Sequence, residues 1–208
     1  YRALRRAFLM TVHRGLPGVL TVYRPDGSAR WIEAFYEDGW TGQGGENWLY
    51  ANPVVTLFCP DGAWADVEES LIRRSSGTPA NAFTPFLTLS AGQVLGTTVA
   101  DNPGELTAWP EWTIYGPCTT ITATNATTGQ TFTLTYNLAD GETITIVTGC
   151  THPRVIRPAG QNLSGSLNWP TAYLWGLAPG SNSINFAVAG SGTNTAIELR
   201  FYARYEGA

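Results

Sequence analysis

The chain has 208 residues, enough for one or two domains with a hydrophobic core. Only 13% of the residues are charged, about half of the ~25% usual for soluble domains, and the formal net charge is −4. All twelve basic residues are Arg, no basic and aromatic cluster occurs, and no apolar run reaches the ~20 residues that span a bilayer, so neither nucleic-acid contact nor membrane insertion is expected.

The first fourteen residues have the pattern of an amphipathic helix. Its apolar face includes Leu4 and Phe8, whereas Arg2, Arg5 and Arg6 lie on the other face. The segment "GLPG" at 15–18 ends this helix. The Arg face is either solvated or an assembly surface, since Arg forms bidentate pairs with carboxylates.

Short strands are expected next. The segments 19–24 and 29–36 flank Pro25-Asp26-Gly27-Ser28, a strong hairpin signal. The segment "EDGWTGQGGEN" indicates a loop, and "PVVTLFCP" at 53–60 is typical of a buried strand. We predict a first domain over 1–75 and a linker over 76–92.

Residues 93–208 are expected to be almost purely β. Apolar and polar residues alternate over many segments, which indicates sheets with one buried and one solvated face. Regular turn signals between the segments favour a sandwich. Pro179-Gly180 is predicted to turn the chain between two strands, with Asn182 remaining among polar residues around the core. The predicted inward residues include Phe132, Leu134, Tyr136, Leu138, Ile144, Ile146, Ile184, Phe186, Val188, Ile197, Leu199, Phe201, Ala203 and Tyr205.

Groups that could carry chemistry are few. Cys150 and His152 would supply two ligands of a zinc site. Zinc needs three or four ligands, however, and no second pair is suitably spaced. Glu33 and Glu37 could be a glycosidase pair, yet acidic residues beside a Gly turn are usually solvated. We therefore predict no catalytic residue, no cofactor and no metal.

The cysteines and tryptophans leave further expectations. Cys59, Cys118 and Cys150 are an odd number, which favours three free thiols and synthesis in a reducing compartment. Trp109 and Trp175 could stack on sugars if they are exposed on a sandwich, or could be core or interface anchors. The sequence favours core or interface and keeps stacking as the lesser alternative.

Several segments share their order with one known family. "CTTITATNATTGQTFTLTYNLADGETITI", "GQNLSGSL" and "LWGLAPGSNSINFAVAGSGTNTAIELRFYARY" follow one another between 118 and 205. This order resembles the C-terminal domain of the siphophage distal tail protein family. The hairpin "VLTVYRPDG" and the segment "VTLFCPDGAWAD" resemble the ring-forming N-terminal domain of the same family.

The resemblance implies a mainly β chain. Its first part would be a β-sandwich-type ring domain with one helix. The start of this domain would precede Tyr1. Its second part, over 93–208, would be an antiparallel β-sandwich of jelly-roll or galectin-like type.

The resemblance also implies a structural virion protein without catalysis. Such a protein is assembled in the host cytoplasm and becomes a ring, usually a hexamer, at the tail tip. Its implied partners are other copies of itself, the tail tube protein, the baseplate hub or tail-associated protein, and a tail fibre or receptor-binding protein. The alternative is a carbohydrate-binding sandwich that contacts the host surface, with Trp109 and Trp175 as stacking residues.

A closed ring requires two different complementary patches on every subunit. We expect the N-terminal helix and the first hairpin to provide them. The candidate interface residues are Arg2, Arg5, Arg6, Trp31 and Phe35.

Overall fold

The computed structural model of the chain describes residues 15–39, 54–75, 96–149, 153–156 and 160–208. These residues are mainly β, as predicted, with strands β1 to β12 and one short 3-10 helix, Ser164–Ser166. The predicted helix over 1–14, the predicted linker over 76–92, and residues Cys150 and His152 lie outside the described residues. Among the described residues, no helix has the length and hydropathy needed to cross a bilayer.

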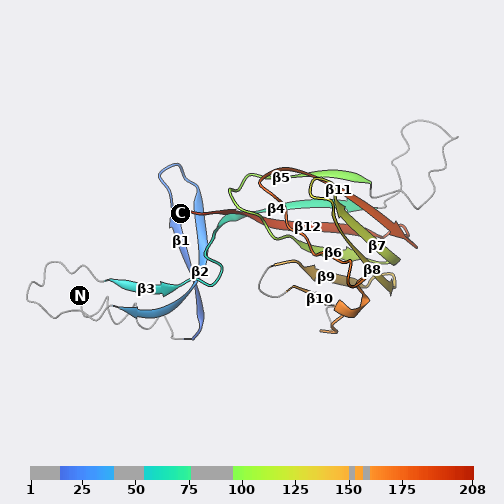
Figure 1. Cartoon of the computed structure of the whole chain (residues 1–208), viewed down its shortest axis with the longest axis horizontal. Coiled ribbons are helices and arrows are strands. Elements are labelled where there is room, and N and C mark those ends of the chain that lie inside the picture. Colours follow the sequence, from blue (N-terminus) through green and yellow to red (C-terminus); the bar gives the residue numbers. More distant parts are fainter. Residues whose placement is uncertain (1–14, 40–53, 76–95, 150–152, 157–159) are drawn as a thin grey trace, which may run out of the picture. The chain divides into compact units, whose positions relative to one another are not determined.

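The chain divides into two compact units (Figure 1). Unit 1 comprises Tyr1–Val67 together with Tyr205–Ala208, and unit 2 is Glu68–Arg204. Strands β4 (Trp64–Ser75) and β12 (Ala196–Tyr205) contribute residues to both units. Unit 2 is therefore continuous in sequence, whereas unit 1 is built from two separate segments.

Unit 1 is organised around the predicted hairpin, which the structure confirms. Its strands are β1 (Pro17–Tyr23), β2 (Ala29–Gly39), β3 (Val55–Phe58) and the first residues of β4, and β2 pairs antiparallel with each of the others. In the turn, the Asp26 carboxylate accepts hydrogen bonds from the Ser28 backbone N–H at 2.9 Å and from the Ser28 hydroxyl at 2.7 Å. Gly27 has a φ of 88°, which a residue with a side chain rarely adopts.

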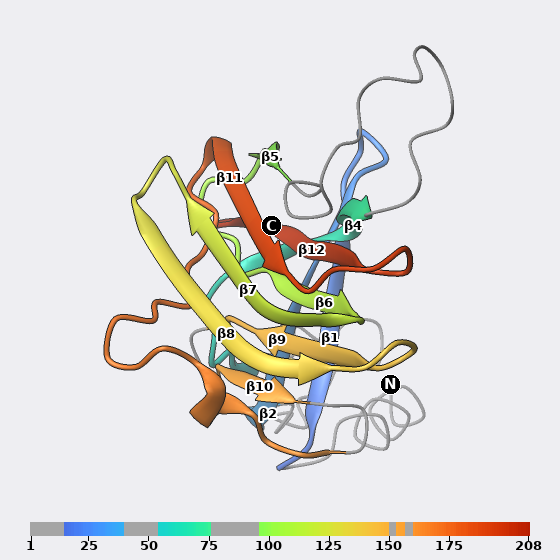
Figure 2. The same ribbon diagram turned by 90° about the vertical axis from the view of Figure 1, so that its right-hand side faces the viewer.

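Unit 2 is an antiparallel β-sandwich, as the alternation predicts (Figure 2). One sheet, called sheet B here, has the order β5 (Thr97–Asn102), β11 (Gly180–Ala189), β7 (Cys118–Asn125), β8 (Gln130–Leu138). The facing sheet, sheet A, has the order β4, β12, β6 (Glu111–Tyr115), β9 (Thr143–Val147), β10 (Arg154–Ile156). The two layers bury the alternate residues of their strands against each other.

Aromatic rings fill the centre of the sandwich. Trp112 of β6 contacts three rings edge to face, with centroid distances of 5.0 Å to Trp175, 5.4 Å to Phe186 and 5.7 Å to Phe132. Such edge-to-face pairs are favoured over parallel sandwiches because of the ring quadrupole. Leucine and isoleucine side chains surround this aromatic centre, and the inward residues predicted on β9, β11 and β12 are buried except Tyr205, which is half-buried.

Three buried asparagines hold the loops at one end of sheet B. Asn102, Asn125 and Asn182 lie at the end of β5, the end of β7 and the start of β11. The Asn182 amide donates to the carbonyls of Ala178 at 2.8 Å and Gly180 at 2.9 Å, and its oxygen accepts from the Ala178 N–H at 3.0 Å. Its oxygen also accepts from the Asn125 amide at 3.3 Å. Asn182 is thus part of the interior, because it satisfies backbone groups of Ala178 and Gly180 where the chain enters β11.

Candidate assembly surface

Unit 1 exposes many large hydrophobic side chains for its size. The buried hydrophobic residues described in it are mostly small: Ala29, Ile32, Ala34 and Ala63. The exposed large hydrophobics are Leu16, Val19, Leu20, Tyr23, Val54, Phe58 and Val67. Contiguous exposed apolar surface on a soluble protein usually marks an interaction site.

Strand register gathers several of these residues on one side of the hairpin. Directly opposed residues of an antiparallel pair share a face, and so do alternate residues of one strand. β1 places Pro17 opposite Phe35 and Thr21 opposite Trp31, and β3 places Phe58 opposite Phe35. This side, which we call the hairpin face, carries Val19, Tyr23, Trp31, Phe35 and Phe58.

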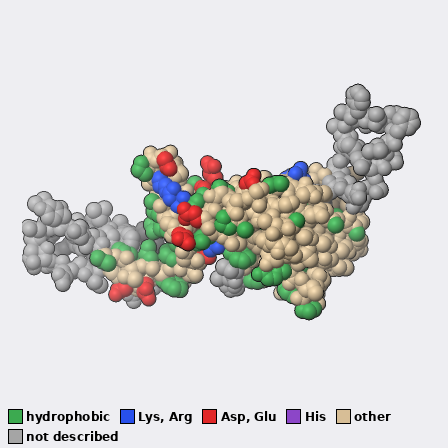
Figure 3. Space-filling model, turned by 45° about the horizontal axis from the view of Figure 1, so that its top comes forward, with side chains coloured by type: hydrophobic (Ala, Val, Ile, Leu, Met, Phe, Trp, Pro, Cys, Tyr) green, Lys and Arg blue, Asp and Glu red, His purple; other side chains and the backbone are tan. Residues whose placement is uncertain are grey.

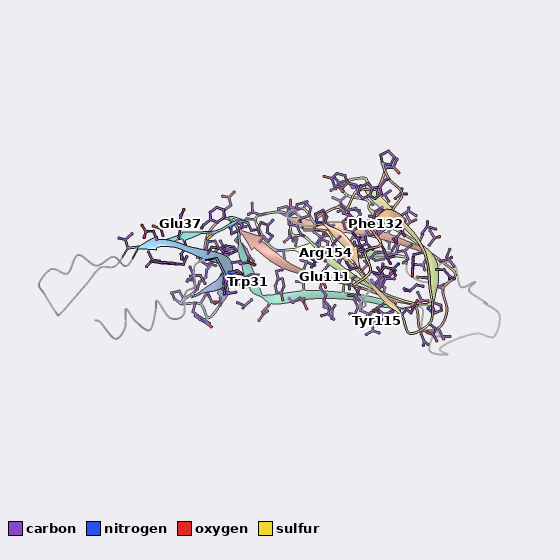
Figure 4. The ribbon with its side chains drawn as sticks, turned by 90° about the horizontal axis from the view of Figure 1, so that it is seen from below. Trp31, Glu37, Glu111, Tyr115, Phe132 and Arg154 are labelled. Carbon is purple, nitrogen blue, oxygen red and sulfur yellow. The ribbon has the colours of Figure 1, made fainter. Side chains whose placement is uncertain are left out.

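The hairpin face is open to solvent at its most apolar positions. Val19 is 66% exposed and Tyr23 is 80% exposed, while Trp31 and Phe35 are half-buried. Trp31 lies on β2 and is labelled in Figure 4. Its indole N–H donates to the Asp66 carbonyl at 2.8 Å, which fixes the ring at the junction of β2 and β4.

The opposite side of the hairpin is occupied. Ile32 and Ala34 are buried there. The Arg30 guanidinium lies 3.4 Å from the centroid of the Tyr205 ring and donates a hydrogen bond to the Gly207 carbonyl. The C-terminal residues of the chain therefore cover part of this side, where Leu20 is 40% exposed, and the hairpin face is the more exposed of the two.

The structure brings two of the predicted interface residues, Trp31 and Phe35, onto this common face. Arg2, Arg5 and Arg6 lie outside the described residues, so their role stays a prediction. Sequence reasoning missed Val19, Tyr23 and Phe58. The expectation of a buried strand over 53–60 is wrong, because Phe58 and every second residue of β3 are exposed. Only the pairing of three strands reveals that these residues share an exposed face.

A carboxylate on the outer side of sheet A forms a network that the sequence did not predict. Glu198 of β12 is buried, although its position in the alternation predicts an outward side chain. It accepts from Arg73 at 3.0 Å, from Arg200 at 3.0 Å and from the Tyr115 hydroxyl at 3.2 Å. The hydrogen bond to Glu198, with a smaller contribution from Glu69, raises the pKa of Arg200.

This network is structural in character. Its two guanidinium groups are matched by two carboxylates, since Arg200 also lies 3.7 Å from Glu69. A buried carboxylate needs such partners because an isolated charge in the interior costs several kcal/mol. Figure 4 labels Tyr115 and Glu111 at the two ends of β6, which lies beside β12.

The two tryptophans considered for sugar stacking have different surroundings. Trp175 is 0% exposed, packs against Trp112 and Phe132, and donates its indole N–H to the Ala123 carbonyl at 3.1 Å. The ring of Trp175 is part of the core and offers no face to a ligand. The predicted stacking of Trp175 on sugars is therefore wrong. Trp109 is half-buried, and stacking by its ring stays a prediction.

The described residues offer packing surfaces more than reactive groups. Within them, no cluster of three or more His, Cys, Asp or Glu could hold a metal ion. Glu33 and Glu37 are both exposed on β2. Cys59 and Cys118 are free thiols, and burial raises the pKa of Cys118 to about 11, which keeps it protonated at neutral pH.

Both a family match and a solved structure relate the chain to phage tail proteins. Residues 103–205 match the family described as siphovirus-type tail component, C-terminal domain. Among solved structures, the chain is similar to the SPP1 Dit (gp 19.1) protein, described as a paradigm of the hub adsorption apparatus in Gram-positive infecting phages. That similarity has a TM-score of 0.61 at 14% identity and covers 98% of this chain and 71% of that one.

A second solved structure, the phage P2 baseplate in its activated conformation with Ca, is similar with a TM-score of 0.47 at 8% identity, covering 86% of this chain and 66% of that one. No curated protein sequence matches the chain. At 14% identity the similarity to the SPP1 Dit protein supports the fold alone, and the family match covers the larger part of unit 2.

Proposed function

Because residues 103–205 belong to the C-terminal domain of the siphovirus-type tail component family, we propose that the chain is a ring-forming adaptor at the tail tip. In this role it joins the tail tube to the baseplate hub and to the host-recognition fibres. Copies of the same chain, in a ring of about six, are its first partners. The role is structural, without catalysis and without a cofactor.

The exposed hairpin face is the observation that carries this proposal. A unit with a small buried core and an aromatic, apolar outer face gains stability when that face is covered, by about 25 cal/mol for each Å² of apolar area removed from water. A neighbouring subunit in a ring provides such a cover at every position. The small core of unit 1 and its open face are thus two aspects of one assembly role.

The complementary patch is assigned to the Arg-rich first residues. A ring uses heterologous contacts, so the hairpin face of one copy must meet a different surface of the next. Glu33 lies opposite Val19 on the hairpin face and is exposed. This carboxylate is opposite in charge to Arg2, Arg5 and Arg6 of the adjacent copy. Arg also suits interface ion pairs better than Lys does.

Light scattering coupled to size exclusion tests the assembly role with one pair of variants. The wild-type chain should form a ring of about six subunits. Val19→Asp places a charge on the hairpin face, and this variant should remain monomeric because a charge is costly to bury in an apolar interface. Val99→Asp is the matched control, since Val99 is 54% exposed on β5 of unit 2. Its ring should be unchanged.

Two results would contradict the proposal. One is a wild-type chain that stays monomeric over the whole accessible concentration range. The other is a Val19→Asp ring as stable as that of the control. Polysaccharide hydrolysis by the pure chain would contradict the non-enzymatic part separately.

A further inference from the structure

A surface segment of unit 2 presents two aromatic rings that the assembly role does not use. After β10 the chain passes through the 3-10 helix Ser164–Ser166 and runs beside β8 from Leu167 to Tyr173 (Figure 2). Within it, Trp169 is 57% exposed and Tyr173 is 52% exposed. They are the two most exposed aromatic side chains described in unit 2.

Backbone hydrogen bonds fix this segment to the edge of sheet B. The Asn168 N–H donates to the Thr133 carbonyl at 3.0 Å, and the Asn168 side-chain oxygen accepts from the Thr133 N–H at 2.8 Å. The Tyr173 N–H donates to the Thr131 carbonyl at 2.9 Å. The segment thereby covers the edge of β8, and its two exposed residues sit on a rigid base.

The two rings are held outward by their neighbours. Tyr173 stands between Ala172, which is buried, and Leu174, which packs against the core, so its side chain points away from the interior. The Trp169 indole N–H donates to the Ser164 carbonyl at 2.8 Å, which fixes the plane of the ring. Rings that are ordered before a ligand arrives lose little conformational entropy when they bind it.

The segments that carry these rings and pack beside them are poor in charge, although the exposed Arg154 of β10 is adjacent to Val155, which contacts Ser164. No Asp, Glu, Arg, Lys or His occurs from residue 158 to 197, nor from 118 to 139 along β7 and β8. The outer side of β7 and β8 is instead lined with threonines that hydrogen-bond in pairs across the strands, Thr122 with Thr133 at 3.0 Å and Thr124 with Thr131. Figure 3 shows how few charged side chains interrupt the large uncharged surface on the face that it draws.

We propose that Trp169 and Tyr173 form a binding site for a neutral polysaccharide. A sugar ring has an apolar C–H side that packs on an aromatic face and hydroxyls that exchange hydrogen bonds with Thr, Asn and backbone groups. A surface with so few cations offers an anionic polymer few ion pairs. This activity goes beyond the adaptor role and does not depend on it, because the rings lie in unit 2 and the hairpin face lies in unit 1.

Affinity electrophoresis of the full chain tests the site. The gels contain dextran, mixed-linkage β-glucan, galactan or mannan, with dextran sulfate as the anionic comparison. At least one neutral polymer should retard the wild-type chain, and Trp169→Ala and Tyr173→Ala should each weaken binding at least about tenfold through lost stacking. Trp169→Phe, which keeps a ring but loses the bond to Ser164, should retain part of the affinity.

Tyr202→Ala is the control, because Tyr202 is an exposed aromatic residue on β12 of the opposite sheet. It should bind as wild type does, and melting curves should show that every variant is folded. Should Trp169→Ala fail to fold, Tyr173→Ala and Trp169→Phe decide the matter. The proposal is overturned if none of the four neutral polymers retards the chain, if only dextran sulfate does, or if the folded ring variants bind normally. It is equally overturned if these variants alter subunit assembly and leave polysaccharide binding intact, since the rings would then be a protein interface.

Discussion

The thiol of Cys118 shows how burial alone changes the chemistry of a residue. Cys118 begins β7 inside the core of unit 2, and burial raises its pKa to about 11 from an ordinary value near 9. Because the folded-state pKa of Cys118 lies above its unfolded value, the protonated thiol contributes fully to the stability of the fold below about pH 9. This contribution is lost as the pH rises toward 11. The thiolate, which is the reactive form, is therefore scarce in the folded protein.

Alkylation of the folded protein should consequently spare Cys118. At pH 8, iodoacetamide should modify Cys59, which is half-buried, well before Cys118, and unfolding in urea should make the two react alike. Mass spectrometry of the digested protein identifies which cysteine carries the label. Labelling of Cys118 in the folded chain at the rate seen in urea would show that this end of β7 opens readily.

Single residues also mark where sequence reasoning stops. The alternation along β12 correctly separates Ile197 and Leu199 from Glu198, but it cannot tell that Glu198 is buried. Its burial depends on Arg73, which lies 125 positions earlier in the chain on a strand without clear periodicity. Contacts of that kind arise from the topology and leave no local signal.

At the scale of elements, strands with strict alternation were predictable and strands with mixed polarity were not. β8, β9, β11 and β12 have one apolar side and were recognised from the sequence. β4 carries charged residues on both sides, as in "VEESLIRR", so the sequence gives no strand signal there. It is nevertheless a strand because β2 and β12 pair with its two portions.

The start of β11 is anchored by the side chain of Asn182. Replacement by Ala would leave the Ala178 and Gly180 backbone groups without their partner in a buried site. We expect Asn182→Ala to lower the free energy of unfolding by about 2 kcal/mol or more, because buried polar groups that lose their partner cost ~1–3 kcal/mol each.

Urea denaturation followed by tryptophan fluorescence measures this loss. The adjacent Ser181 is exposed, so Ser181→Ala should change the stability by no more than about 0.5 kcal/mol. Equal effects of the two substitutions would mean that the asparagine cluster does not anchor this end of the sheet.

At the scale of the molecule, the core and the open surface are distributed unequally. Unit 2 contains the aromatic centre and every member of the main core cluster, while unit 1 contains the exposed hairpin face. The sequence predicted two domains of β type. It could not predict that residues 205–208 return to the first unit, since no pattern in "YEGA" points to Arg30 as a partner.

Hydrogen exchange should report this unequal distribution. Amides of β7, β8 and β11 should exchange slowest, because opening them exposes the core, and amides of β1 should exchange fastest among the described strands of the unassembled Val19→Asp variant. In the assembled wild-type chain, β1 should become protected as a neighbouring subunit covers the hairpin. Identical β1 exchange in the two samples would place the subunit contact elsewhere.

The two crossings between the units, at 67/68 on β4 and at 204/205 on β12, have a consequence for how this architecture can change. The two strands are neighbours in one sheet, so unit 2 leaves and re-enters unit 1 at adjacent points. Residues 68–204 therefore form a cassette inserted within the sequence of unit 1, and the two units are not arranged in tandem along the chain. A different sandwich with neighbouring ends could replace this cassette while leaving the hairpin and its C-terminal strap intact, so that the hairpin face and the surface displayed by the cassette could evolve independently.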